Sequence, residues 1–224
     1  MSAINDGYYG IECDIQPTKD KTLVVFHDLN LKRLAYIDKN ILDCDWEYIK
    51  EVKLTKVKVD KHAYQGEIML FEDFIAFIKK SSSKAFIEIK ETFAGEHVTL
   101  MLDIIKKSNI DKNQVVIIAN KCSLPQLIEL RKIDKEIKLQ FVACNDYTRY
   151  VDDCLKHKID LDVCKQVYLD HQEQFAIDVD RFHQHGLEVN CWVVDDKDLL
   201  HELENLGVDY ITTDSLKPMT HGRE

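Results

Sequence analysis

The sequence has no long hydrophobic run and no excess of positive charge. No window approaches the roughly 18 consecutive apolar residues that a membrane-spanning helix requires, so the sequence predicts no membrane span. Thirty Lys and Arg residues stand against forty Asp and Glu residues, which gives a formal net charge of -10 at pH 7. This charge would repel the phosphates of a nucleic acid or an anionic membrane surface. We therefore exclude both as first-choice partners.

Paired cysteine motifs are also missing. The seven cysteines are an odd number, and no two of them form a Cys-x-x-Cys pair, which is typical of free thiols in a reducing compartment. Residues Met1–Gly10 lack the positive segment and apolar stretch of a secretory signal. The sequence therefore predicts a cytoplasmic protein.

The length and composition favour one folded domain. A chain of 224 residues fits one domain of the larger kind. Its 45% hydrophobic and 31% charged residues are sufficient for a buried core. We expect a single domain over residues 1–224.

Short runs rich in Val, Ile and Phe alternate with longer amphipathic segments. Runs of the first kind predict strands: Gly10–Gln16, Leu23–His27, Ala85–Lys90, Gln114–Ala119, Lys138–Cys144, Gln166–Leu169, Glu188–Val194 and Tyr210–Thr213. Apolar residues at three- and four-residue spacing predict helices: Phe71–Lys80, His97–Lys107, Leu124–Ile133, Glu173–His185 and Lys197–Leu206. This alternation favours a parallel sheet covered by helices.

A Gly-rich phosphate loop is absent, which favours a closed α/β barrel over a nucleotide-binding sheet. Residues 41–70 are weakly periodic and mixed in charge. We expect them to form an irregular excursion between barrel elements.

The first predicted strand carries two acids on one face. On an extended chain, Glu12 and Asp14 point to one side while Cys13 and its apolar neighbours point to the other. Unpaired carboxylates on a covered strand would cost several kcal/mol, and a bound cation would remove that cost. The alternative is an ordinary polar strand face.

The strand Ala85–Lys90 repeats the arrangement, because Glu88 and Lys90 share a face. One interpretation is an interior ion pair that adds little stability. The other is a third metal carboxylate beside an ammonium group that binds phosphate. Three carboxylates form a hard oxygen set that suits Mg²⁺ or Ca²⁺ better than Zn²⁺.

An apolar run ends in His27, followed by Asp28. A histidine at the end of a strand is well placed for proton transfer near neutral pH. The alternative is a turn at the end of the strand. The remaining histidines lie in no recognisable constellation and are assigned no chemistry.

Taken in order, these segments resemble the glycerophosphodiester phosphodiesterase family. The similar segments are Gly10–Asp20, Leu23–Asp28, Phe86–Lys90, Val189–Val194 and Tyr210–Asp214, and the resemblance covers residues 7 to 218. It implies a (β/α)₈ TIM barrel that hydrolyses glycerophosphodiesters to an alcohol and glycerol 3-phosphate.

The resemblance also implies residue roles. Glu12, Asp14 and Glu88 match the residues that hold a divalent cation, Mg²⁺ or Ca²⁺. His27 matches one of two catalytic histidines, and Lys90 matches a phosphate contact. Trp192 matches a residue that lines the substrate pocket, although its strand position also fits a core tryptophan.

The sequence departs from the family pattern at its start. Residues Met1–Gly7 do not supply the family's first strand with its His-Arg-Gly element, or the helix after it. We therefore expect a barrel that lacks the first strand and most of the first helix. Three hypotheses follow: an active phosphodiesterase, a degenerate member that binds cation or phosphodiester with little turnover, and an unrelated interaction module. Self-association that fills the gap stays open.

Overall fold

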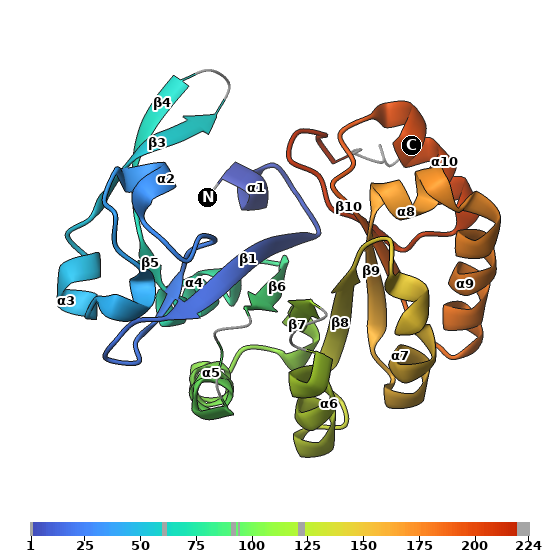
Figure 1. The fold of residues 1–224 in the computed structure, drawn as a ribbon, viewed down its shortest axis with the longest axis horizontal. Helices are drawn as coiled ribbons and strands as arrows, with labels where there is room; N and C mark the ends of the chain where they lie inside the picture. Colours follow the sequence, from blue (N-terminus) through green and yellow to red (C-terminus); the bar gives the residue numbers. More distant parts are fainter. Residues whose placement is uncertain (1, 60–61, 91–92, 94, 121–123, 219–224) are drawn as a thin grey trace. The chain divides into compact units, whose positions relative to one another are not determined.

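The computed structural model describes residues 2–59, 62–90, 93, 95–120 and 124–218, and its chain divides into two compact units. The N-terminal unit is Tyr9–Val115, and the C-terminal unit is Val116–Glu224 together with Met1–Tyr8. Both units combine parallel strands with helices (Figure 1). The predicted α/β class is therefore confirmed.

In the N-terminal unit, strand β1 (Gly10–Pro17) has a neighbour on each side. It pairs in parallel with β6 (Lys84–Ile89) and antiparallel with β2 (Leu23–Val25). The short β5 (Met69–Leu70) continues the sheet beyond β2. Gly10 is required at the start of β1, because a Cβ there would lie 2.4 Å from Cε2 of Phe86.

One face of this sheet is apolar because every second residue of β1 and β6 is apolar. Cys13, Ile15, Ile87 and Ile89 are all buried. The helix α4 (Phe71–Ile78) packs near β2 and β6 and buries residues at helical spacing, namely Phe71, Phe74, Ile75 and Ile78. A second helix, α5 (Gly95–Ser108), packs beside α4.

The segment expected to be irregular has its own structure. It contains η1 (Ile41–Asp43), α3 (Trp46–Ile49) and a hairpin of β3 (Lys53–Val59) and β4 (His62–Glu67). A buried apolar cluster joins this segment to β2 and to the chain after it, which includes α2 (Lys32–Ala35). The cluster consists of Val24, Phe26, Leu31, Ile41, Cys44, Ile49, Val52, Leu54 and Ile68.

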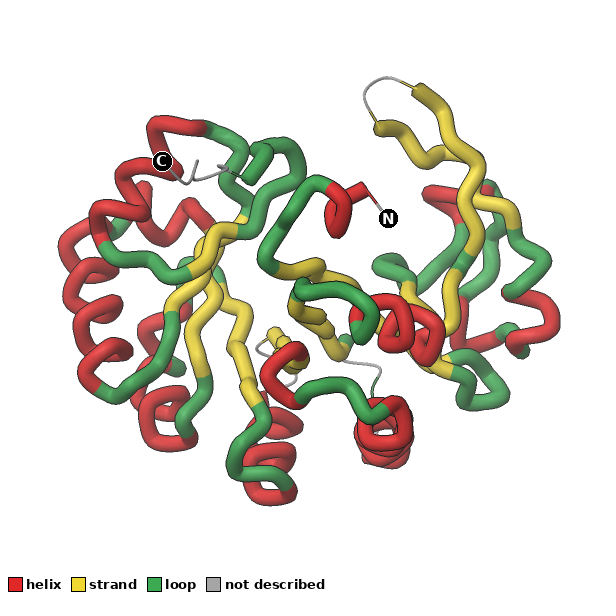
Figure 2. Tube along the Cα trace, turned by 180° about the vertical axis from the view of Figure 1, so that it is seen from behind, coloured by secondary structure: helices red, strands yellow, loops and turns green. Residues whose placement is uncertain are grey.

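In the described part of the C-terminal unit, the strands of the sheet follow one another in chain order. These are β7 (Val115–Asn120), β8 (Lys138–Ala143), β9 (Asp160–Cys164), β10 (Val189–Trp192) and β11 (Tyr210–Ile211), all parallel. The connecting helices are α6 (Leu124–Ile133), α7 (Val151–His157), α8 (Lys165–Asp170), α9 (Gln172–Gln184) and α10 (Lys197–Leu206). Figure 2 shows helices lying along the outer side of these strands. The N-terminal Ser2–Asn5 forms the short helix α1, and η2 (Lys112–Gln114) and η4 (Tyr147–Arg149) are short 3₁₀ turns.

The strand predicted at Gln166–Leu169 is wrong. Those residues lie in α8, and the strand is β9 at Asp160–Cys164. The error has a physical cause: β9 alternates Asp160 and Asp162 with apolar residues, and both aspartates are buried. Buried acids on a strand look like a polar loop in the sequence.

Asp160 has charged neighbours at the start of β8 and just before β10. Its carboxylate accepts the backbone N–H of Glu188 at 3.0 Å, and the Lys138 ammonium lies 3.5 Å from it. Burial raises the pKa of Asp160 to about 6, while the Glu188 N–H and Lys138 act in the opposite direction. This carboxyl therefore titrates well above its usual range.

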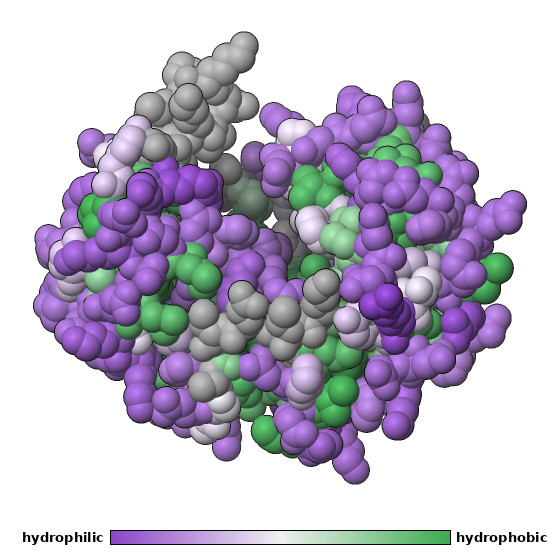
Figure 3. Space-filling model, in the orientation of Figure 1, coloured by the Kyte–Doolittle hydropathy of each residue, from purple (hydrophilic) through white to green (hydrophobic). Residues whose placement is uncertain are grey.

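The exposed surface is polar. Hydrophilic residues make up most of the surface visible in Figure 3. None of the helices in the described part of the chain is both long and apolar enough to cross a bilayer.

Candidate functional site

Three carboxylates converge on one face of β1 and β6. Glu12 and Asp14 are two residues apart on β1, so both side chains leave the same face. Asp14 is directly paired with Glu88 in the parallel ladder. One carboxylate oxygen from each of the three residues lies within 4.8 Å of the others. The sequence expectation that these acids come together is met in the geometry of the N-terminal unit.

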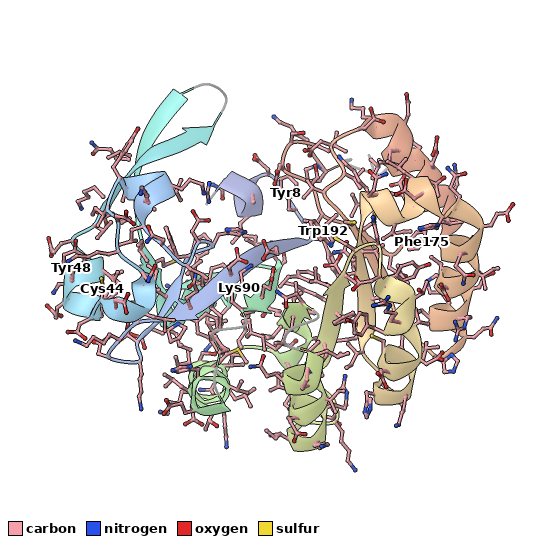
Figure 4. The ribbon with its side chains drawn as sticks, in the orientation of Figure 1. Tyr8, Cys44, Tyr48, Lys90, Phe175 and Trp192 are labelled. Atoms are coloured by element: carbon pink, nitrogen blue, oxygen red, sulfur yellow. The ribbon has the colours of Figure 1, made fainter. Side chains whose placement is uncertain are left out.

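Lys90, which is labelled in Figure 4, follows β6. Its Nζ forms ion pairs with Oδ1 of Asp14 and with Oε1 of Glu88, the latter at 3.0 Å. All three side chains are less than one-fifth exposed. Because two carboxylates side by side in a partly buried site repel each other, the ammonium group offsets most of that cost.

Burial and charge act against each other on these groups. Burial raises the pKa of Glu88, and the charge of Lys90 opposes this shift while that of Asp14 adds to it. Burial alone would lower the pKa of Lys90, but the hydrogen bond that Lys90 donates to Asp14 and the negative charges of Glu88 and Asp14 raise it above its usual value. Lys90 therefore stays positively charged throughout the neutral pH range.

His27 lies two residues after the end of β2, and its side chain is 66% exposed. Its Nδ1 is 2.7 Å from Oδ1 of Asp28. Arg33 donates to the same carboxylate through Nε at 2.6 Å and through Nη2 at 2.9 Å. Burial raises the pKa of Glu88, and among the opposing causes is the charge of His27, so His27 lies within electrostatic range of this carboxylate.

Asp28 has a lowered pKa, so its carboxylate is negatively charged beside His27. The hydrogen bond from Arg33 lowers the pKa of Asp28, burial opposes the shift, and the hydrogen bond with His27 adds to the lowering. Asp28 therefore fixes which ring nitrogen of His27 faces the protein.

Trp192, the sixth expected site residue, is the last residue of β10 in the C-terminal unit. It is half-buried, and its indole Nε1 has no hydrogen-bond partner within the described residues. Asn190 lies on the same strand face and donates its Nδ2 to Oγ1 of Thr212 at 3.0 Å. The other expected site residues all belong to the N-terminal unit.

Sequence reasoning missed two residues near His27. Gln16 lies on the face of β1 that carries Glu12 and Asp14, and the two-residue periodicity would have found it. Its amide contacts the segment 26–28. Arg33 gives no such signal, because five residues of irregular chain and helix separate it from His27.

The fold and the site together define a class, the α/β barrel hydrolases with a carboxylate cluster on one face of neighbouring strands. The chain belongs to the glycerophosphoryl diester phosphodiesterase family, whose model matches residues 1–217. A sequence comparison with curated proteins gives no match.

Solved structures of this family have the same fold. A glycerophosphodiester phosphodiesterase from Parabacteroides distasonis is 22% identical, with a TM-score of 0.76 over 95% of this chain and 82% of that chain. One from Thermotoga maritima is 22% identical, with a TM-score of 0.73 over 95% and 84%. A phosphodiesterase from Oleispira antarctica, solved with its product sn-glycerol-3-phosphate, is 17% identical, with a TM-score of 0.79 over 95% and 84%. The α/β TIM-barrel fold class expected from the sequence is therefore confirmed.

Proposed function

We propose that this protein hydrolyses glycerophosphodiesters to an alcohol and glycerol 3-phosphate with the help of a divalent cation. The observation that carries the proposal is the convergence of Glu12, Asp14 and Glu88 within 4.8 Å. Family membership supports the reaction class, and the product found in the Oleispira structure supports glycerol 3-phosphate as a product here.

The three carboxylates fit a hard cation. Carboxylate oxygens are the ligands that Mg²⁺ and Ca²⁺ prefer, and ligands about 2.0–2.6 Å from one ion lie at most about 5 Å apart. The observed separation meets that limit. A cation bound there would neutralise negative charge on the phosphoryl oxygens.

Lys90 would contribute a second positive charge to phosphate binding. Its pKa is raised by the acids around it, so the ammonium group is charged whenever substrate is present. If a bound cation neutralised the charges of Asp14 and Glu88, the Lys90 ammonium would be able to donate to a phosphoryl oxygen.

His27 would exchange the proton of the reaction. Because Asp28 engages Nδ1, Nε2 is the atom left for proton transfer. The neighbouring glycerol hydroxyl would lose its proton and attack phosphorus, and the bond to the alcohol oxygen would break as that oxygen gains a proton, which gives the alcohol and a cyclic glycerol phosphate. Water would then attack phosphorus and open the ring to give glycerol 3-phosphate. Nε2 would exchange a proton with one of the oxygens that lose or gain one in these steps. That Trp192 lines the substrate pocket, as the family resemblance implies, stays a prediction.

The test is release of glycerol 3-phosphate from glycerophosphocholine, with added Mg²⁺ or Ca²⁺ and with a chelator. We expect cation-dependent release that Glu12→Ala, Glu88→Ala and His27→Ala each reduce, with His27→Ala costing roughly 10²–10⁴-fold. Glu47→Ala is the matched control, because Glu47 is an exposed acid of the same unit that pairs with Lys50. Activity unchanged by the three site variants would refute the assigned roles. Cation binding without turnover would support the second hypothesis, a family member that binds but does not turn over.

A further inference from the structure

Gln16 makes an unusual set of contacts for a buried strand residue. Its side chain is fully buried on β1, on the face that carries Glu12 and Asp14. The amide Nε2 donates to three successive backbone carbonyls, those of Phe26, His27 and Asp28, at 2.9, 3.0 and 2.7 Å. Since these acceptors are carbonyls, the amide nitrogen must face them.

The segment 26–28 needs this support because it lies beyond the end of β2. A ladder-like bond to β1 runs from the Phe26 N–H to the Asp14 carbonyl at 2.9 Å. The imidazole of His27 is largely exposed, so packing does not fix it. The position of the ring therefore depends on its hydrogen bond with Asp28 and on the hydrogen bonds that hold the backbone of both residues.

All the hydrogen bonds found for the Gln16 amide go to this segment. Its Oε1 is buried and has no hydrogen-bond partner in the described part of the chain. A buried polar atom without a partner costs free energy, and an apolar residue of similar size would avoid that cost. The hydrogen bonds that the amide donates to three carbonyls therefore explain why a glutamine occupies this position.

We propose that Gln16 is a positioning residue that holds the backbone of His27 at a fixed place relative to Asp14. Gln16 follows Asp14 by two residues on the same face of β1. One strand therefore carries both a carboxylate of the cluster and the amide that donates three hydrogen bonds to residues 26–28, which we call the clamp. The consequence for catalysis rests on the proposed function of His27. The hydrogen bonds of the clamp do not depend on that function.

The first test measures the clamp without activity. Gln16→Met keeps the volume and removes the donor, and Gln16→Glu keeps the shape and replaces the donor with an acceptor. We expect amide hydrogen exchange at Phe26 to speed up roughly 10-fold in both variants, and the ring signal of His27 to shift in the NMR spectrum. Exchange in the β1–β6 ladder, at Ile87 and Ile89, should stay unchanged.

Gln140→Met is the matched control. Gln140 is equally buried on β8 of the C-terminal unit, so this variant loses a buried amide and should leave Phe26 and His27 unaffected. Exchange at Phe26 equal to wild type in both Gln16 variants would overturn the proposal. Exchange that speeds up equally at Phe26 and Ile87 would also overturn it, because that pattern indicates general loss of stability.

The second test measures kinetics. A displaced catalytic group lowers turnover far more than substrate binding, so we expect kcat to fall roughly 10-fold or more in Gln16→Met while KM changes little. A wild-type protein without phosphodiesterase activity would contradict the proposed function and leave the exchange test of the clamp standing. An active wild type whose kcat is the same in Gln16→Met would contradict the positioning role.

Discussion

Asp14 and Glu88 are directly paired on the neighbouring parallel strands β1 and β6, and one ammonium group, that of Lys90, contacts both. Pairing two acids across a ladder is unfavourable without a positive charge between them. The protein supplies one such charge from Lys90 and leaves Glu12 as a third acid beside the pair. This arrangement favours cation binding at one place on the sheet.

Replacing Lys90 should make the stability of the protein depend on added cation. We expect Lys90→Met to lower the free energy of unfolding by about 2–3 kcal/mol without cation, because Asp14 and Glu88 then repel each other in a partly buried site. Added Mg²⁺ or Ca²⁺ should restore part of the loss, since a ligand that binds only the folded state stabilises it. Urea unfolding with and without the cation measures both effects. A variant as stable as wild type, with no response to cation, would contradict this account.

Arg33 should act on Asp28 more than on stability. Its side chain is 61% exposed, so we expect Arg33→Gln to change the free energy of unfolding by less than about 1 kcal/mol. The hydrogen bond from Arg33 is the largest cause of the lowered pKa of Asp28, so that pKa should rise toward its usual value. NMR titration of the Asp28 carboxyl measures the shift. Lys32→Gln is the control, because Lys32 is a neighbouring exposed base that pairs with Asp38 instead.

Asp160 should make stability depend on pH. Its pKa is raised from 3.8 to about 6 in the folded protein, so the folded state binds the proton more tightly than the unfolded state. The stabilisation is complete below the unfolded pKa and is lost as the pH rises through about 6. At about 1.4 kcal/mol per pKa unit, the full loss is about 3 kcal/mol.

Asp160→Asn removes this titration and keeps an oxygen that accepts the Glu188 N–H. We expect the variant to match wild type near pH 4 and to be more stable by about 2–3 kcal/mol near pH 7.5. Urea unfolding of both proteins across this range gives the difference directly. A difference that does not grow with pH would show that Asp160 is ionised at little cost in the folded protein.

Much of the fold followed from periodicity. The alternation in β1 predicted that Glu12 and Asp14 share a face, and the ranges predicted for α6 and α10 match the structure. The strand β9 was missed because its buried positions are aspartates. The hairpin of β3 and β4 was missed because its residues 53–67 are mixed in charge and weakly periodic.

The candidate site was predicted in part for the same reason. Acids that alternate on a strand are visible in a sequence, and so is a histidine at a strand end. The register that pairs Asp14 with Glu88 is a property of the folded sheet. The contacts of Gln16 and Arg33 depend on how the chain turns after β2, which local patterns do not specify.

The central claim is that Glu12, Asp14 and Glu88 bind one divalent cation. The most direct measurement is a crystal structure of the full chain grown with Mn²⁺, with the ion located by its anomalous scattering. The account predicts a peak within about 2.0–2.6 Å of a carboxylate oxygen from each of the three residues. Complete diffraction data that show no anomalous peak there, with Lys90 still paired to Asp14 and Glu88, would contradict the claim.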